Sequence, residues 1–254
     1  MLDRHAHLAT IETEGRRLAM AASMAGPGAV VPTCPEWSMR DLVLHQGEVH
    51  RWAALVVAEG IAKPSAVPAD HVGPLPDDEQ LVAWFTDGLE RLLGALAEAA
   101  DDLEAFTFLA DAPSPALFWS RRQAHETEMH RVDAESALHV LTPFDPASAV
   151  DGIDEMLVGF VPRKHTPFHL DPPRTLAVHA TDAGSGWHLE ISDGPAVTRR
   201  IDPGDPSVAD CTVRGSASDV YLALWNRQGL EPLEITGDAD VFAAFRTSVR
   251  ISWR

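Results

Sequence analysis

The residues most able to do chemistry in this 254-residue chain are histidines and carboxylates at helical spacing. The segment WSRRQAHETEMHRVDAE holds Glu126 and His130 at positions i and i+4, which places both side chains on one face of a helix. A second segment holds His45 and His50, which would point ~140° apart on a helix, so only one of them can join that pair. Two histidines and a carboxylate form a typical ligand set for a divalent metal with an open coordination position.

The polar face around Glu126 leaves two interpretations open. In a helical bundle, Glu126 and His130 could meet His45 from another helix and bind zinc, or iron through the same ligands. Arg122 and Asp133 share the face and are candidates for orienting Glu126 and His130. The alternative is a structural one, in which His45 is a hydrogen-bonded core histidine and Glu126 pairs with Arg122 in a buried ion network. Spacing alone does not decide between the two.

Four segments with helical periodicity must position these side chains. The clearest start signal is Ser38, an N-cap residue with Asp41 in the first turn and with Trp37 and Leu42 at the two hydrophobic-staple positions. Long helices joined by short or medium loops are typical of a four-helix bundle. The sequence therefore predicts a bundle whose helices run from Leu2 to Met24, over 38–59, from Asp77 to Ala99, and from Ser114–Pro115 to just before Pro143.

The second half of the chain has a different pattern. After the linker-like sequence TPFDP, a short helix is expected near Asp154 to Phe160. Strand-like runs follow at RTLAVHAT, GWHLEIS, AVTRRI and ADCTVRG, separated by glycine and proline turns. Two amphipathic segments, Ser218 to Arg227 and Asp240 to Val249, complete the pattern. The expected fold is a four-helix bundle over residues 1–142 followed by a small α+β domain over residues 151–254.

Charge and hydropathy exclude several classes of partner. The 38 acidic and 20 basic residues give a formal charge of −18, which disfavours binding to nucleic acid or to an anionic membrane. No apolar stretch reaches the ~18 residues needed to cross a bilayer, and the N-terminus has no signal-peptide pattern. We therefore expect a cytoplasmic protein.

The cysteines indicate that any thiol chemistry depends on an external thiol. Cys34 and Cys211 are the only two, and they fall in different predicted domains. Neither a disulfide framework nor a cysteine-based zinc site is indicated.

Two stretches of the bundle resemble the signatures of a known family. TCPEWSMRDLVLHQGEVHRW and RRQAHETEMHRVDAE are similar to those of the mycothiol-dependent maleylpyruvate isomerase family, whose N-terminal domain is a DinB-like bundle. GSASDVYLALWNR followed by EITGD resembles its second domain, so the likeness covers nearly the whole chain. The family's metal ligands correspond here to His45, Glu126 and His130.

The resemblance implies an enzyme with one divalent metal ion, expected to be zinc, and with mycothiol as its thiol cosubstrate. The metal would lower the pKa of the thiol, and the thiolate would attack an electrophilic carbon in a cis–trans isomerisation or an S-transfer. For a dianionic substrate such as maleylpyruvate, Arg227 is a candidate for binding a carboxylate. The plainer explanation of Arg227 is that basic residues are common at helix C-termini.

Two other functions compete with this one. The chain could be a noncatalytic binding module for a metal or small ligand, or a structural protein whose polar row is an ion-pair network. A metal assay separates the structural protein from the others. Turnover of an electrophile with added mycothiol separates the enzyme from the binding module.

Overall fold

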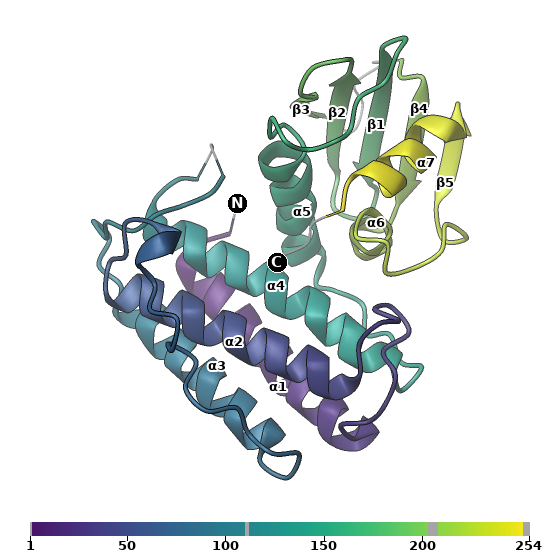
Figure 1. Ribbon diagram of the computed structural model, residues 1–254. Coiled ribbons are helices and arrows are strands. Elements are labelled where there is room, and N and C mark those ends of the chain that lie inside the picture. Colours follow the sequence, from purple (N-terminus) through teal and green to yellow (C-terminus); the bar gives the residue numbers. More distant parts are fainter. Residues whose placement is uncertain (1, 110–111, 203–207, 251–254) are drawn as a thin grey trace. The chain divides into compact units, whose positions relative to one another are not determined.

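The chain folds into two compact units, Met1–Thr142 and Pro143–Arg254. The computed structural model describes residues 2–109, 112–202 and 208–250, so the last residues of the expected C-terminal domain, 251–254, lie outside the described part. The first unit is helical and the second contains a mixed sheet with helices (Figure 1). The predicted fold class, a helical bundle followed by a small α+β domain, is confirmed.

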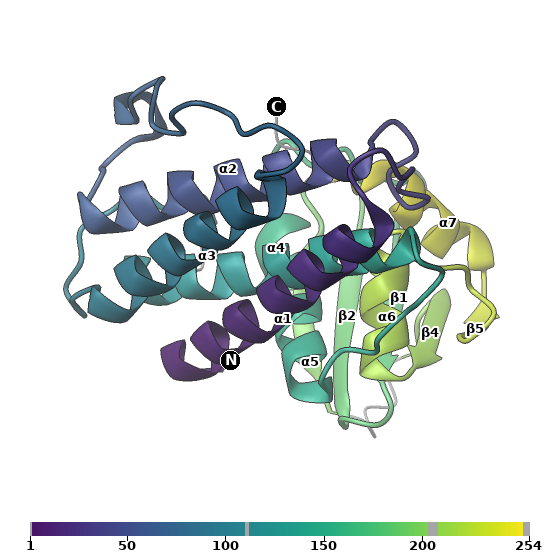
Figure 2. The ribbon, with the colours of Figure 1, turned by 90° about the horizontal axis from the view of Figure 1, so that it is seen from below.

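The first unit contains the four predicted helices, which lie side by side in both views (Figures 1 and 2). Helix α1 packs mainly against α4, and α2 packs mainly against α3. The third helix begins later than expected, because the Asp77 carboxylate accepts a hydrogen bond from the Gln80 backbone in a turn before it. Their bounds are α1 Arg4–Ala25, α2 Met39–Ala58, α3 Leu81–Glu98 and α4 Pro115–Ser136, with a short 3₁₀ helix, η1, at Pro64–Ala66.

Local sequence explains where the two helices that carry the candidate ligands begin. The Ser38 hydroxyl accepts from the Asp41 backbone N–H while the Asp41 side chain accepts from the Ser38 backbone, which is the predicted capping box of α2. Helix α4 starts with Ser114 as N-cap and Pro115 in its first turn, where the missing proline N–H costs no hydrogen bond. Both starts are fixed by residues next to them in the chain.

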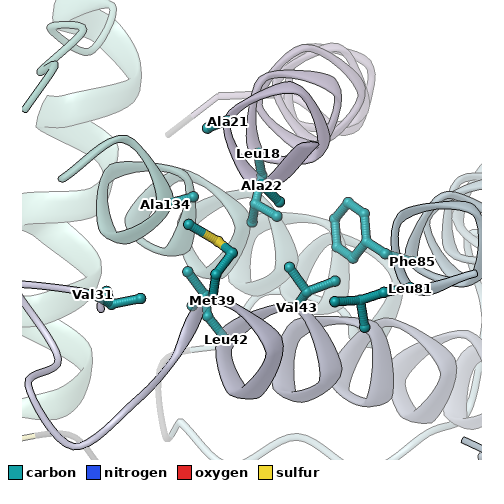
Figure 3. Close-up of a cluster of buried hydrophobic side chains, with 10 residues drawn as sticks. All are labelled: Leu18, Ala21, Ala22, Val31, Met39, Leu42, Val43, Leu81, Phe85 and Ala134. Carbon is teal, nitrogen blue, oxygen red and sulfur yellow. The ribbon is translucent and has the colours of Figure 1, made fainter. Parts of the chain in front are cut away.

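An apolar cluster joins the helices of the first unit (Figure 3). Met39, Leu42 and Val43 of α2 pack there against α1 residues and against Leu81 and Phe85 of α3. Burial of such side chains contributes about 1.5–3 kcal/mol each relative to exposure. The cluster therefore fixes the start of α2, a few residues before His45. Its other members are Leu18, Ala21, Ala22, Val31 and Ala134.

The second unit opens with a helix that the sequence pattern placed too late. Helix α5 covers Pro146–Asp154 and continues as a π-helical segment, η2, over Glu155–Phe160. The prediction that the helix lies near Asp154 to Phe160 was wrong about its start. Asp145 caps it and Pro146 occupies its first turn, so the proline of the supposed linker is a helix start signal.

The sheet of the second unit has the strand order β3-β2-β1-β4-β5, with β1 and β4 parallel and the other neighbours antiparallel. Helices α6 and α7 pack against β1 and β4 (Figure 1). The first four strands match the predicted runs, whereas β5 was not predicted as a strand. The bounds are β1 Arg174–Ala180, β2 Ser185–Ile191, β3 Val197–Ile201, β4 Cys211–Gly215, β5 Glu234–Gly237, α6 Ala217–Leu224 and α7 Ala239–Ser248.

None of the helices in the described ranges is long and apolar enough to span a membrane.

Candidate metal centre

Three side chains from two helices converge inside the first unit. His45 lies on α2, and Glu126 and His130 lie on α4. One nitrogen or oxygen atom from each comes within 4.8 Å of the corresponding atoms of the other two. The Nε2 atoms of His45 and His130 lie 3.8 and 3.3 Å from the same oxygen, Oε1 of Glu126.

These separations fit a cation better than direct hydrogen bonds. Hydrogen bonds between nitrogen and oxygen are usually ~2.7–3.2 Å long. Ligand atoms each ~2.0–2.1 Å from a tetrahedral Zn²⁺ are about 3.4 Å apart, close to the two distances from Glu126 Oε1. Two imidazoles and a carboxylate also suit this class of ion chemically. The residues present therefore fit a divalent metal.

The two ligand candidates on α4 are held by neighbours on the same helix. Arg122 Nη2 donates to Glu126 Oε2 at 2.9 Å, which leaves Oε1 facing the histidines. The Nδ1 atom of His130 lies 2.9 Å from Asp133 Oδ2, so Nδ1 carries the proton in that hydrogen bond and Nε2 faces Glu126. The two residues expected to orient the ligands thus contact them directly.

The same contacts set the charges of this pair. Burial by itself would raise the pKa of Glu126, but its contacts with His130 and His45 and the charge of Arg122 hold it well below its usual value. Burial would lower the pKa of His130, but the hydrogen bond to Asp133 and the contact with the Glu126 carboxylate raise it to about 9. The cluster therefore contains an ionised carboxylate at neutral pH.

The α2 ligand candidate is held differently. Among the described residues, His45 has no side-chain polar contact other than the one with Glu126. Its ring instead packs against Trp37, with ring centroids 4.9 Å apart. The Trp37 ring is also stacked on His130 at 6.0 Å, with an angle of 25° between the planes. One indole therefore contacts both imidazoles.

His50 takes a different role from His45. It is fully buried, and its Nε2 atom lies 2.7 Å from the Gln46 amide nitrogen and 3.0 Å from the Thr127 hydroxyl. Burial, the largest influence, lowers the pKa of His50 to about 3, so the ring is neutral at physiological pH. Of the two α2 histidines, the structure brings His45 to Glu126 and His130, and His50 to a neighbouring polar cluster.

Two further candidates do not belong to the three-residue group. His125 is buried beside Glu128, with 3.0 Å between Nδ1 and Oε2, and does not belong to the cluster. Arg227 is in the second unit, and its expected position at the end of a helix was wrong. Helix α6 ends at Leu224, because Asn226 adopts a left-handed φ of 59°. A role for Arg227 in binding substrate stays a prediction.

Sequence reasoning missed the contacts that Trp37 and Thr127 make near this cluster. Trp37 was assigned to core packing, and it does pack against the apolar cluster as well as against the histidines. Thr127 follows Glu126 directly, and Gln46 follows His45. The sequence did contain a signal for the Thr127 contact. Gln46 and Thr127 are uncharged polar residues, and such side chains on buried helix faces need hydrogen-bond partners.

The fold and this cluster define a class: a two-domain protein whose N-terminal helical bundle presents a His-Glu-His set. Residues 8–135 match the family model described as the mycothiol maleylpyruvate isomerase N-terminal domain, and residues 147–244 match the model of the MDMPI C-terminal domain. The chain belongs to the mycothiol maleylpyruvate isomerase family. The resemblance identified from the two signature stretches is therefore confirmed, and membership supports an enzyme.

Solved structures agree with the family in fold. The chain is similar to the crystal structure of the mycothiol-dependent maleylpyruvate isomerase, at 15% identity over 92% of this chain and 93% of the other, with a TM-score of 0.60. A mutant of that isomerase gives the same identity and coverage with a TM-score of 0.59. No curated protein matches the sequence. At this identity the structural likeness shows the fold alone.

Proposed function

We propose that the protein is a metal-dependent, mycothiol-using enzyme that adds the thiol to an electrophilic small molecule, as an isomerase or an S-transferase. The observation that carries this proposal is the convergence of His45, Glu126 and His130 from two helices. Family membership supports mycothiol as the thiol. Neither of the chain's two cysteines belongs to this group, whose three members are two histidines and a glutamate.

The side chains of the bundle would hold the metal and prepare the site. Glu126 Oε1 and the Nε2 atoms of His45 and His130 are the ligand atoms, and zinc is the ion we expect. Asp133 keeps the proton of His130 on Nδ1, and Arg122 keeps Glu126 Oε2 turned away. A divalent cation bound there would supply a positive centre that lowers the pKa of a coordinated thiol. The indole of Trp37 covers one side of the two imidazoles.

The reaction follows from the chemistry of a thiolate. Its sulfur forms a C–S bond with an electrophilic carbon, and the electron pair of the C=C bond moves to a conjugated carbonyl. In an isomerase the resulting single bond rotates, the C–S bond breaks and the double bond reforms as the trans isomer. In a transferase the carbon of the resulting enolate is instead protonated by solvent, and the adduct is released. Both routes use the same first step, so the cluster supports either.

Two measurements test the proposal, first of metal content and then of turnover. Protein purified without chelator should carry about one equivalent of divalent metal, as expected for a single three-ligand site. It should consume a chromogenic electrophile only when mycothiol is added, and chelation should abolish this activity. Cys34→Ala and Cys211→Ala should leave the activity unchanged, because neither residue belongs to the cluster.

Different failures lead to different conclusions. Metal binding without thiol-dependent turnover of any electrophile would favour the noncatalytic binding module. A protein that binds no divalent metal at all would leave the polar row as an ion-pair network. A thiolate-to-metal absorption band in cobalt-substituted protein on addition of mycothiol would identify the thiol as a metal ligand, independently of the choice of electrophile.

A further inference from the structure

A buried polar bridge connects the two ligand-bearing helices directly beside the metal centre. Gln46 and His50 come from α2, and Thr127 comes from α4. The Gln46 Nε2 atom lies 2.7 Å from His50 Nε2 and 3.3 Å from Thr127 Oγ1, and His50 Nε2 lies 3.0 Å from the same hydroxyl. All three side chains are 0% exposed. Gln46 Nε2, His50 Nε2 and Thr127 Oγ1 thus all contact one another.

The bridge occupies the positions next to the ligands in the chain. Gln46 follows His45, and Thr127 follows Glu126, so each residue in the contact between Gln46 and Thr127 is the chain neighbour of a residue in the contact between His45 and Glu126. The Thr127 hydroxyl also donates to the Gln123 carbonyl at 2.7 Å, which fixes its position on α4. The distance and rotation of α2 relative to α4 are therefore tied at this level of the bundle.

Of the three candidate ligands, His45 depends most on how α2 is held against α4. Glu126 and His130 are oriented by Arg122 and Asp133, whereas His45 has no such polar neighbour among the described residues. Its side chain is 22% exposed, more than the 7% and 10% of the other two, so packing restrains it less. The place of its Nε2 atom is consequently set by where α2 lies.

We propose that Gln46, His50 and Thr127 are positioning residues, which hold α2 against α4 so that His45 completes the metal site. The inference rests on the metal site proposed above. The bridge acts through the helix backbone, since none of its three residues belongs to the candidate ligand group.

The composition of the bridge supports a role beyond packing. Gln46 Oε1 and His50 Nδ1 are buried without a hydrogen-bond partner among the described residues. An unsatisfied buried polar atom costs about 1–3 kcal/mol, so apolar residues of similar volume would stabilise the bundle more. Polar groups in a helical core are best known for fixing helix register, since they pair in only one arrangement. A ligand set divided between two helices requires that the two helices pack in one fixed register.

The test compares buried hydroxyls on α4. Thr127→Val removes the hydroxyl and keeps the shape, and Thr127→Ser restores the hydroxyl. Ser120→Ala is the matched control, because the Ser120 hydroxyl is also fully buried and donates to the carbonyl four residues earlier, at 2.8 Å, and within the described ranges it makes no hydrogen bond to α2. Gln46→Met removes the amide from the other end of the bridge. Each variant is tested as the full chain with Co²⁺, whose affinity and visible spectrum are both measured.

We expect Thr127→Val and Gln46→Met to weaken Co²⁺ binding by about 10- to 100-fold, the usual effect of removing a group that supports a ligand from outside the coordination sphere. The visible spectrum should change too, because a displaced His45 is replaced by solvent. Thr127→Ser should recover most of the affinity, and Ser120→Ala should match the unaltered protein. The free energy of unfolding without metal, measured alongside, separates a fall in affinity from a loss of fold.

A double-substitution cycle with His45→Ala shows whether the bridge acts through His45. Thr127→Val should cost little further affinity once His45 is absent, since the two changes disturb the same ligand. The inference is overturned if Thr127→Val, or Gln46→Met where the former does not fold, keeps the affinity and spectrum of the unaltered protein. It is also overturned if the two losses simply add. If the unaltered protein binds no Co²⁺, it is the proposed metal site that fails.

Discussion

The two helices of the proposed metal centre hold their candidate ligands by different means. On α4, Arg122 braces Glu126 from four residues away and Asp133 braces His130 from three residues away. On α2, His45 has a ring contact with Trp37 and depends on the arrangement of neighbouring helices. Support on α4 is therefore local and electrostatic, whereas support on α2 is tertiary.

The difference separates what the site needs chemically from what it needs geometrically. A ligand pair braced within one helix keeps its orientation as long as that helix forms. A ligand braced across helices is lost when the packing shifts by a fraction of an ångström, because metal bonds tolerate deviations of only about 0.2 Å. Changes to the residues that brace the α4 ligands should thus alter ligand chemistry, and changes that shift α2 against α4 should alter the placement of His45.

The largest effect should come from removing a ligand of the braced pair. His130→Ala deletes the Nε2 atom that faces Glu126, so bound metal should fall from about one equivalent to a small fraction of that. Elemental analysis after dialysis against a metal buffer measures the content. His125→Gln is the control, because His125 is buried on the same helix but lies outside the cluster. Full metal content in His130→Ala would show that the ligand assignment is wrong.

A smaller effect should follow from removing the brace and keeping the ligand. Asp133→Asn weakens the hydrogen bond that fixes the tautomer of His130, and we expect metal affinity to fall about 10- to 100-fold. Competition with a chromophoric chelator measures this affinity.

The chain supplies a matched control for this change. Glu128 lies 3.0 Å from the Nδ1 atom of His125, the same i,i+3 pairing of carboxylate and histidine on the same helix. Glu128→Gln should leave metal affinity unchanged. Equal losses in both variants would mean that Asp133 acts only through the stability of α4.

On α2, His50 should make the free energy of unfolding depend on pH. Burial lowers the pKa of His50 to about 3, so as pH falls below its usual value near 6.5 the unfolded chain takes up a proton that the folded chain refuses. Stability contributed by this neutral ring is present above about pH 6.5 and is lost as pH falls toward 3. Between pH 7 and pH 5 the loss should be about 2 kcal/mol.

Denaturant unfolding in the presence of chelator, at several pH values, measures this loss. His50→Gln should be less dependent on pH over this range by about the same 2 kcal/mol, because glutamine does not titrate. Parallel pH profiles for the variant and the unaltered protein would exclude His50 as the source.

What could be predicted from sequence follows the same division between local and tertiary support. The α4 ligands and their braces are three or four residues apart, so helical periodicity alone put Arg122, Glu126, His130 and Asp133 on one face. The capping box at Ser38 is also local, and it was predicted correctly. Periodicity left the choice between His45 and His50 open, because that choice depends on how α2 is rotated against α4.

Other differences have the same cause. Pro146 was interpreted as part of a linker although it begins α5, since a proline after Asp145 indicates a turn or a helix start equally well. Strand β5 is short, and its four residues are recognisable mainly through their pairing with β4. The contact of Trp37 with both imidazoles needs the loop before α2 to fold back over the site, which no periodicity encodes.

The smallest effect on metal affinity should come from replacing Trp37. The fluorescence of this residue also reports on the surroundings of His45 on α2. Aromatic contacts contribute about 0.5–1.5 kcal/mol, so Trp37→Leu should weaken metal binding by roughly 3- to 10-fold. Because its indole packs on both histidines, Co²⁺ binding should quench the fluorescence of Trp37, and Trp37→Phe should remove most of the quenching. Trp52 is the control: it also lies in an aromatic group, with Phe106 and Trp119, and has no ring contact with either ligand histidine. Trp52→Phe should keep the quenching; its loss in this variant instead would place the cation away from His45 and His130.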